Sequence, residues 1–109
     1  MHALLLLTLG LFSSGHDDPL PVVASPSPEV CSSFELTGFY EKWVELNGFP
    51  IVGSRHVHNE ALLEARWLIK KMIGHRPEIL KAMADQKVHF TVMAHDEWTT
   101  DVPEHSTLY

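Results

Sequence analysis

The sequence contains a single cysteine, so no disulfide framework within the chain can support the fold. It also contains few basic residues, 8 Lys and Arg against 14 Asp and Glu, which gives a formal net charge of −6. Because phosphate binding needs clustered Lys and Arg, this balance argues against nucleic acid and against an anionic membrane surface as partners. No apolar run reaches the about 20 residues that a membrane-spanning helix needs.

Residues 1–15 have the pattern of a secretory signal peptide. An apolar run from Ala3 to Phe12 contains four consecutive leucines, and three small residues follow it at positions 13–15. Only His2 and the amino terminus offer positive charge before the run, and a buried N-terminal segment is the alternative interpretation. The pattern predicts a secreted, extracellular protein that has no membrane contact once the signal peptide is removed.

Residues 16–33 are predicted to form a Pro/Ser-rich tether. Prolines stand at positions 19, 21, 26 and 28, with serines and aspartates between them. Since proline fixes φ and lacks a backbone N–H, this spacing favours extended conformations over helix. Cys31 has no base beside it in the sequence, so we expect it to pair with another chain, or with the missing part of a larger protein, rather than to act as a nucleophile.

The remaining residues, 34–109, are predicted to form one small α/β (or α+β) subdomain. Apolar spacing predicts helices over 34–47, 59–74 and 77–85, and strands over 49–52 and 88–94. Two strands separated by two helices form a crossover unit, so we expect them to lie parallel in a small two-stranded sheet. The expected fold is therefore about three helices with that sheet, as an incomplete domain.

The segment 59–74 is the longest periodic stretch and is expected to organise the fold. Asn59 is predicted to cap this helix, and Gly74 to end it with a positive φ. Its core-facing arc is predicted to consist of apolar residues at helical spacing: Ala61, Leu62, Ala65, Leu68, Ile69, Met72 and Ile73.

Three large apolar residues are candidates for an interface. Leu63 and Trp67 lie one turn apart on the otherwise charged face of the helix over 59–74, and Trp98 lies in the C-terminal tail. Exposed large apolar side chains usually mark a partner surface. They predict contact with the remainder of a larger parent protein, or with a protein or peptide partner.

Histidine is frequent, with 8 residues, and invites a metal interpretation. His56 and His58 alternate in a loop but lack a third ligand, so solvated imidazoles are the favoured interpretation. His89 and His95 are six residues apart in the strand over 88–94, about 20 Å in an extended chain, which is too far to share an ion. Asp96 and Glu97 are interpreted as solvated loop charges.

Asp101, Glu104 and His105 form the best polar cluster, in the sequence DVPEH. Pro103 stiffens this turn and can hold a carboxylate near an imidazole. One interpretation is a cleft residue or a group that orients a zinc ligand. The favoured interpretation is a turn whose side chains satisfy local backbone donors.

The succession GFYEKWVELNGFPIVGS, ALLEARWLIKKM and FTVMAHDEWTTDVPEHS resembles the N-terminal portion of a family of secreted zinc metallopeptidases. This family is grouped with the zincins related to the catalytic domain of anthrax lethal factor. The resemblance covers 34–108, and the phrase TTDVPEH after a strand is its most specific part.

The family's zinc site lies on a later helix that carries H-E-x-x-H, and this sequence contains no such motif. The resemblance therefore implies a segment that stops before the zinc-binding helix, with no catalytic, cofactor-binding or metal residue of its own. Zinc is expected only in a full-length relative. The expected function is a non-catalytic scaffold; the alternatives are a stand-alone secreted protein- or peptide-binding module and a histidine-based metal-binding protein.

Overall fold

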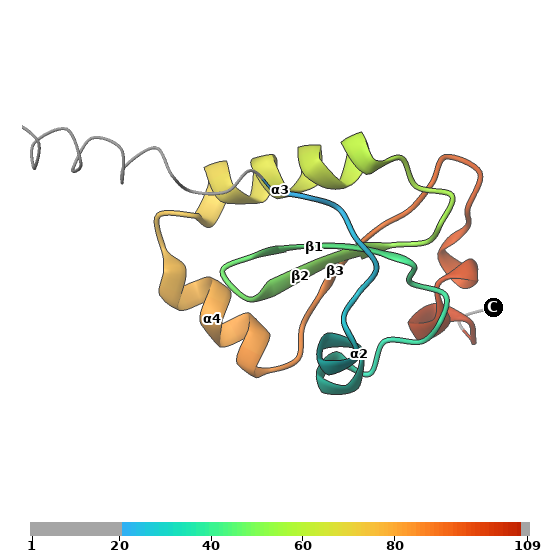
Figure 1. Cartoon of the computed structure of the whole chain (residues 1–109), viewed down its shortest axis with the longest axis horizontal. Coiled ribbons are helices and arrows are strands. Elements are labelled where there is room, and N and C mark those ends of the chain that lie inside the picture. Colours follow the sequence, from blue (N-terminus) through green and yellow to red (C-terminus); the bar gives the residue numbers. More distant parts are fainter. Residues whose placement is uncertain (1–20, 108–109) are drawn as a thin grey trace, which may run out of the picture.

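The computed structural model describes residues 21–107, and these residues form an α/β fold (Figure 1). The elements are α2 (Pro28–Phe34), β1 (Lys42–Leu46), β2 (Phe49–Gly53), α3 (Asn59–Ile73), α4 (Pro77–Asp85), β3 (Phe90–Val92) and the short 3-10 helices η1 (Thr99–Asp101) and η2 (Pro103–His105). The predicted fold class is confirmed, although the sheet has three strands instead of two. The predicted signal peptide lies outside the described residues.

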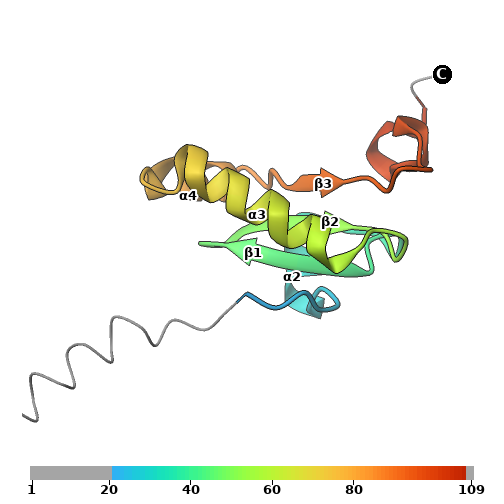
Figure 2. The ribbon, with the colours of Figure 1, turned by 90° about the horizontal axis from the view of Figure 1, so that it is seen from above.

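β2 is the central strand of the sheet. It pairs antiparallel with β1 and parallel with β3, which gives the order β1-β2-β3. The parallel pairing of β2 with β3 confirms the predicted crossover through two helices. Every residue of β2 is buried, because α3 covers one face of the sheet while α2 lies on the other (Figures 1 and 2).

The predicted helix over 34–47 is wrong, because residues 42–46 form β1. The connection from β1 to β2 is the pair Asn47-Gly48, whose φ angles are 50° and 85°. Two consecutive positive φ angles define the type I′ hairpin turn, and Asn-Gly is the pair that adopts it most readily. Val44 and Leu46 are buried while Glu45 between them is exposed, which is the period of a strand.

α2 begins inside the segment that was predicted to be a tether. Ser27 caps it by accepting a hydrogen bond from the N–H of Val30 at 3.2 Å, and Pro28 takes the first helical position, where no donor is needed. The expectation that prolines keep this segment free of helix is therefore wrong over 28–33. Upstream, the backbone of Ala24 pairs with that of Trp43 through hydrogen bonds of 3.0 and 2.8 Å.

α3 has nearly the predicted bounds but packs through a different stripe. Leu62 is fully buried and shares a core with Leu80 of α4, whereas Leu68 and Met72, predicted to lie in the core, are largely exposed. Arg66 donates from Nε to the carbonyl of Glu45 at 2.8 Å, which ties one flank of the helix to β1. The helix is therefore rotated away from the predicted orientation.

Two details of the helix and strand ends also differ from prediction. His58 rather than Asn59 is the N-cap residue of α3, without a side-chain cap, and Gly74 ends the helix with φ −64°, so no positive φ is needed there. β3 is confined to Phe90–Val92, shorter than the predicted 88–94, because β2 offers only three partners to it.

The core has two parts, one on each face of the sheet. The part beneath α3 consists of Val44, Leu46, Phe49, Ile51, Val57, Leu62 and Leu80. The part on the opposite face consists of Leu36, Tyr40, Val52 and Val102. Val102 comes from the tail between η1 and η2, so the C-terminal segment folds back onto the sheet.

Candidate functional site

The two outer edges of the sheet differ. On the β1 edge, both backbone groups of Trp43 bond to Ala24, and the carbonyl of Glu45 accepts from Arg66. On the β3 edge, the register places Thr91 opposite Val52, whose backbone groups face β3. The N–H and C=O of Thr91 therefore point away from the sheet. Within residues 21–107, no strand pairs with this side of β3.

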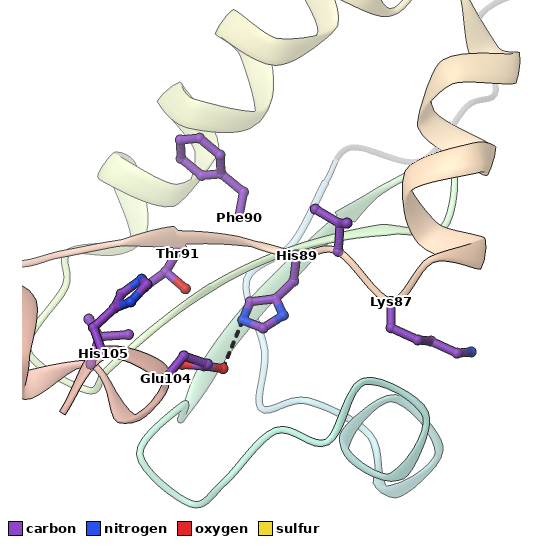
Figure 3. A pocket seen from close by; sticks show the side chains of 8 residues that line it. Lys87, His89, Phe90, Thr91, Glu104 and His105 are labelled. Atoms are coloured by element: carbon purple, nitrogen blue, oxygen red, sulfur yellow. Dashed lines mark ion pairs between the residues drawn. The ribbon is translucent and has the colours of Figure 1, made fainter. Parts of the chain in front are cut away.

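A groove of about 440 Å³ runs along this free edge. Residues 87–91 contribute to its lining: Lys87 lies in the turn after α4, with φ 65°, and Phe90 and Thr91 begin β3. Because Phe90 and Thr91 are consecutive strand residues, their side chains point to opposite faces, so the groove lies along the edge of the strand. We call it the edge groove; its lining residues are Lys87, Val88, His89, Phe90, Thr91, Val102, Glu104 and His105 (Figure 3).

One side of the edge groove is apolar. Phe90 points from β3 toward α3 (Figure 3) and keeps 44% of its surface exposed. Leu68 and Met72 lie on the flank of α3 away from Arg66, because at about 100° per residue they are turned from it by about 200° and about 240°. Since Arg66 reaches β1, this exposed apolar flank faces the β3 side.

The other side is polar, and its centre is the carboxylate of Glu104. Oε1 of Glu104 accepts a hydrogen bond from the Tyr40 hydroxyl, and Oε2 lies 3.1 Å from Nε2 of His89 (Figure 3). Thr91 donates from Oγ1 to the Tyr40 oxygen at 3.5 Å. His89 is largely covered, by Glu104 and by the Tyr40 ring, whose centroid lies 5.6 Å from that of the imidazole.

The surroundings of Glu104 and Tyr40 keep the carboxyl group ionised and the hydroxyl group protonated. Burial raises the pKa of Glu104, but hydrogen bonds from Tyr40 and its own backbone, together with the imidazoles of His89 and His105, outweigh burial and lower it below the ordinary 4.5. Burial and the adjoining Glu104 raise the pKa of Tyr40. At neutral pH Tyr40 is a fixed donor and Glu104 a fixed acceptor, so the pair fastens η2 to the sheet rather than moving protons.

The lowered pKa of Glu104 predicts that this residue makes the stability of the fold depend on pH. Its folded-state pKa is below its unfolded value, so its contribution is present above pH 4.5 and is lost as the pH falls through the folded pKa. Wild type should therefore lose more stability than Glu104→Gln between pH 7 and pH 3, measured by urea denaturation at each pH. Parallel losses in the two proteins would contradict this assignment.

The predicted polar cluster is divided in the structure. Glu104 and His105 line the edge groove, whereas Asp101 accepts the backbone N–H of Trp98 at 2.9 Å through Oδ2 and caps η1. The favoured interpretation of a locally bonded turn is confirmed for Asp101. A second hollow of about 330 Å³ includes Asp101 and His56 in its lining.

Glu97 also differs from its interpretation as a solvated charge. Its Oε2 accepts from the hydroxyl of Ser54 at 2.5 Å, and its Oε1 accepts from the N–H of Ala94 at 2.8 Å. Because Ser54 is buried, this carboxylate joins the end of β2 to the loop after β3. Asp96 beside it is exposed.

The predicted interface residues lie in two separate places. Trp67 and Trp98 are exposed by 52% and 77%, while Leu63 is half-buried against the core beneath α3. Leu63 and Trp67 line a shallow hollow on α3 together with Glu60 and Glu64. The role of these residues as an interface stays a prediction.

The polar residues of the edge groove do not suit zinc. Both oxygens of Glu104 are engaged, by Tyr40 and His89, and no group of three His, Cys, Asp or Glu within residues 21–107 could hold a metal ion. His56 and His58 are both exposed. No step of metal chemistry is therefore assigned to this chain.

No known protein family matches the sequence, and comparison with curated proteins and with solved structures gives no match. The resemblance to the zincin-like family, and the secretion that the N-terminal pattern predicts, therefore stay predictions. None of the helices within residues 21–107 has both the length and the apolar character to cross a membrane.

Proposed function

We propose that this chain is the non-catalytic N-terminal scaffold segment of a secreted protein of the zinc-metallopeptidase-like family, and that the β3 edge receives further polypeptide. The family comes from the sequence resemblance over 34–108. The observation that supports a scaffold is the difference between the two sheet edges. Ala24 and Arg66 cover the β1 edge, whereas Thr91 presents its backbone groups on the β3 edge.

A sheet edge with unpaired backbone groups is unusual in native proteins, which supports the proposal that a partner covers it. Exposed edge strands offer a template for pairing with other chains, and native proteins blunt them with charges, prolines, bulges or covering segments. The β3 edge carries the half-exposed Val88 and Phe90, which both line the edge groove. Apolar surface next to unpaired backbone is the surface that an added strand covers.

The polar contacts also support a role without catalysis. Glu104 is occupied by Tyr40 and His89, and Asp101 caps a backbone turn. A general acid or base needs a pKa near the working pH, and the pKa of Glu104 is shifted away from neutrality. These groups hold the tail on the sheet.

The intact mass of the secreted product of the native gene tests this proposal. An antibody against α3 would recover it from culture medium for mass spectrometry. We expect a species well above the 12.3 kDa of this chain, with an H-E-x-x-H motif in its additional sequence. A species slightly below 12.3 kDa, as signal-peptide removal leaves, would overturn it.

A stand-alone secreted binding module is the second candidate, and one observation favours it. Val102 is buried against Tyr40 and Val52, so the tail completes the core on that face of the sheet without any other chain. This candidate requires the full chain to unfold in one cooperative thermal transition, with the calorimetric and van't Hoff enthalpies equal. It also requires that the secreted species has a mass slightly below 12.3 kDa.

A further inference from the structure

We infer that the edge groove binds an extended segment of a partner polypeptide, which adds to β3 as a fourth strand. The segment carries apolar side chains at alternate positions, and these cover Val88 and Phe90, the exposed apolar residues that line the groove. The inference rests on the proposed scaffold function, because it specifies the kind of polypeptide that the β3 edge receives.

The backbone of β3 supplies the first part of the argument. The N–H and C=O of Thr91 point into the groove, and strand addition supplies their missing partners. The groove follows residues 87–91, but Lys87 lies in a turn with φ 65°, so its strand-like part is at most residues 88–91, about 13 Å. It therefore accommodates a segment of about four residues.

The two walls determine the pattern of the segment. Side chains of an added strand alternate between the α3 face and the opposite face. On the α3 face they meet Val88 and Phe90, which line the groove and are 43% and 44% exposed. Burying such side chains is worth about 25 cal/mol for each Å² of apolar surface removed from water.

On the opposite face the charged groups are already engaged. Glu104 bonds to Tyr40 and His89, and Nζ of Lys87 donates to Oγ of Ser33 at 2.9 Å. A charged residue of the partner would have to compete with these contacts. Neutral polar side chains, such as threonine, therefore fit the positions that face this wall.

The net charge favours a different polypeptide over a second copy of this chain. Two chains of formal charge −6 repel each other, whereas a basic segment is attracted. The partner segment is therefore an amphipathic strand with basic residues at its ends, outside the groove.

A labelled heptapeptide of sequence Lys-Val-Thr-Val-Thr-Val-Lys tests the inference, by fluorescence anisotropy with the full 109-residue chain. We expect saturable binding, weakened about tenfold or more in the isomer Lys-Val-Val-Val-Thr-Thr-Lys, which has the same composition without alternation. Backbone N-methylation separates strand addition from apolar adhesion. Methylating the amides on one side of the strand should abolish binding, while methylating those on the other side should preserve it.

Two protein variants locate the site. Phe90 and Met93 are each 44% exposed, but only Phe90 lines the edge groove. Phe90→Ser should weaken binding about tenfold, and Met93→Ser should retain it, with circular dichroism confirming that both are folded. Because both side chains are half-exposed already, neither substitution should prevent folding.

Four results of the peptide and variant experiments would overturn the inference, and a fifth result, described after them, would do so as well. They are no saturable binding up to about 1 mM peptide, equal binding of the two isomers, equal effects of the two methylation patterns, and equal effects of the two variants. A dimer that Phe90→Ser dissociates would assign the groove to a second copy, which also overturns it. A negative peptide result combined with a large secreted species would leave the scaffold function standing, so the two failures are distinguishable.

Discussion

Replacing Leu62 by alanine is expected to lower the free energy of unfolding by about 3 kcal/mol, within the usual range for a leucine deleted from a packed core. Leu62 is fully buried where α3 crosses the sheet, and it shares its cluster with Phe49, Ile51 and Leu80. Its removal leaves a cavity that two helices and a strand all border. The total free energy of unfolding of a small domain is only about 5–15 kcal/mol, so this loss is a large fraction of it.

Leu68→Ala is the matched control, because it makes the same chemical change six residues later on the same helix. Leu68 is 47% exposed, so the expected loss is less than about 1 kcal/mol. Urea denaturation followed by tryptophan fluorescence would measure both variants. A larger loss for Leu68→Ala than for Leu62→Ala would contradict the observed rotation of α3 and favour the arc predicted from the sequence.

Tyr40→Ala is expected to cost about 4 kcal/mol, as for other large aromatic deletions from a core. Tyr40 is 2% exposed, and its ring packs with Leu36, Val52 and Val102. It also lies edge-on against the rings of Phe39 and His89. Its removal would therefore release the tail as well as open the core.

Tyr40→Phe separates the ring from the hydroxyl. Only the hydrogen bond to Glu104 is lost, and the expected cost is about 1 kcal/mol at pH 7. Since that hydrogen bond lowers the pKa of Glu104, the pKa should rise in this variant. Guanidinium denaturation and NMR titration of the carboxyl would measure the two effects. An unchanged Glu104 pKa would show that the hydroxyl does not stabilise the carboxylate.

The strands show what local sequence can and cannot specify. Residues 49–52 were predicted as a buried strand, and the parallel crossover to β3 followed from the order of the elements. Residues 42–46 were not predicted as a strand, because the apolar residues between 39 and 46 fit a helical spacing as well as a period of two. The pair Asn47-Gly48 fits both interpretations, because Asn and Gly are favoured at helix C-termini as well as in type I′ turns. In the structure its two consecutive positive φ angles close a hairpin.

The orientation of α3 could not come from its own sequence. Its apolar residues cover a wide arc, and the sheet selects the part of it centred on Leu62 and Ile69. That selection depends on contacts such as Arg66 with Glu45, 21 residues apart in the chain. A helical wheel contains no information about such partners.

The candidate site was predicted only in part. The sequence DVPEH indicated that Glu104 and His105 belong together, and both line the edge groove. The burial of His89 depends on Tyr40 and Glu104, which are 64 residues apart from each other. The groove itself depends on which edge of the sheet stays unpaired, and alternation within one strand does not reveal its neighbours.

The hydrogen bonds between Ala24 and Trp43 have a consequence for assembly. Fibre growth by strand pairing requires each unit to bond on both sides, so that every addition creates a new attachment point. Within residues 21–107, Ala24 and Arg66 occupy the β1 side, which leaves the Thr91 side to accept a strand. The unit is therefore monovalent: one addition completes it, and the combined sheet can grow further only if the added partner brings an unpaired edge of its own.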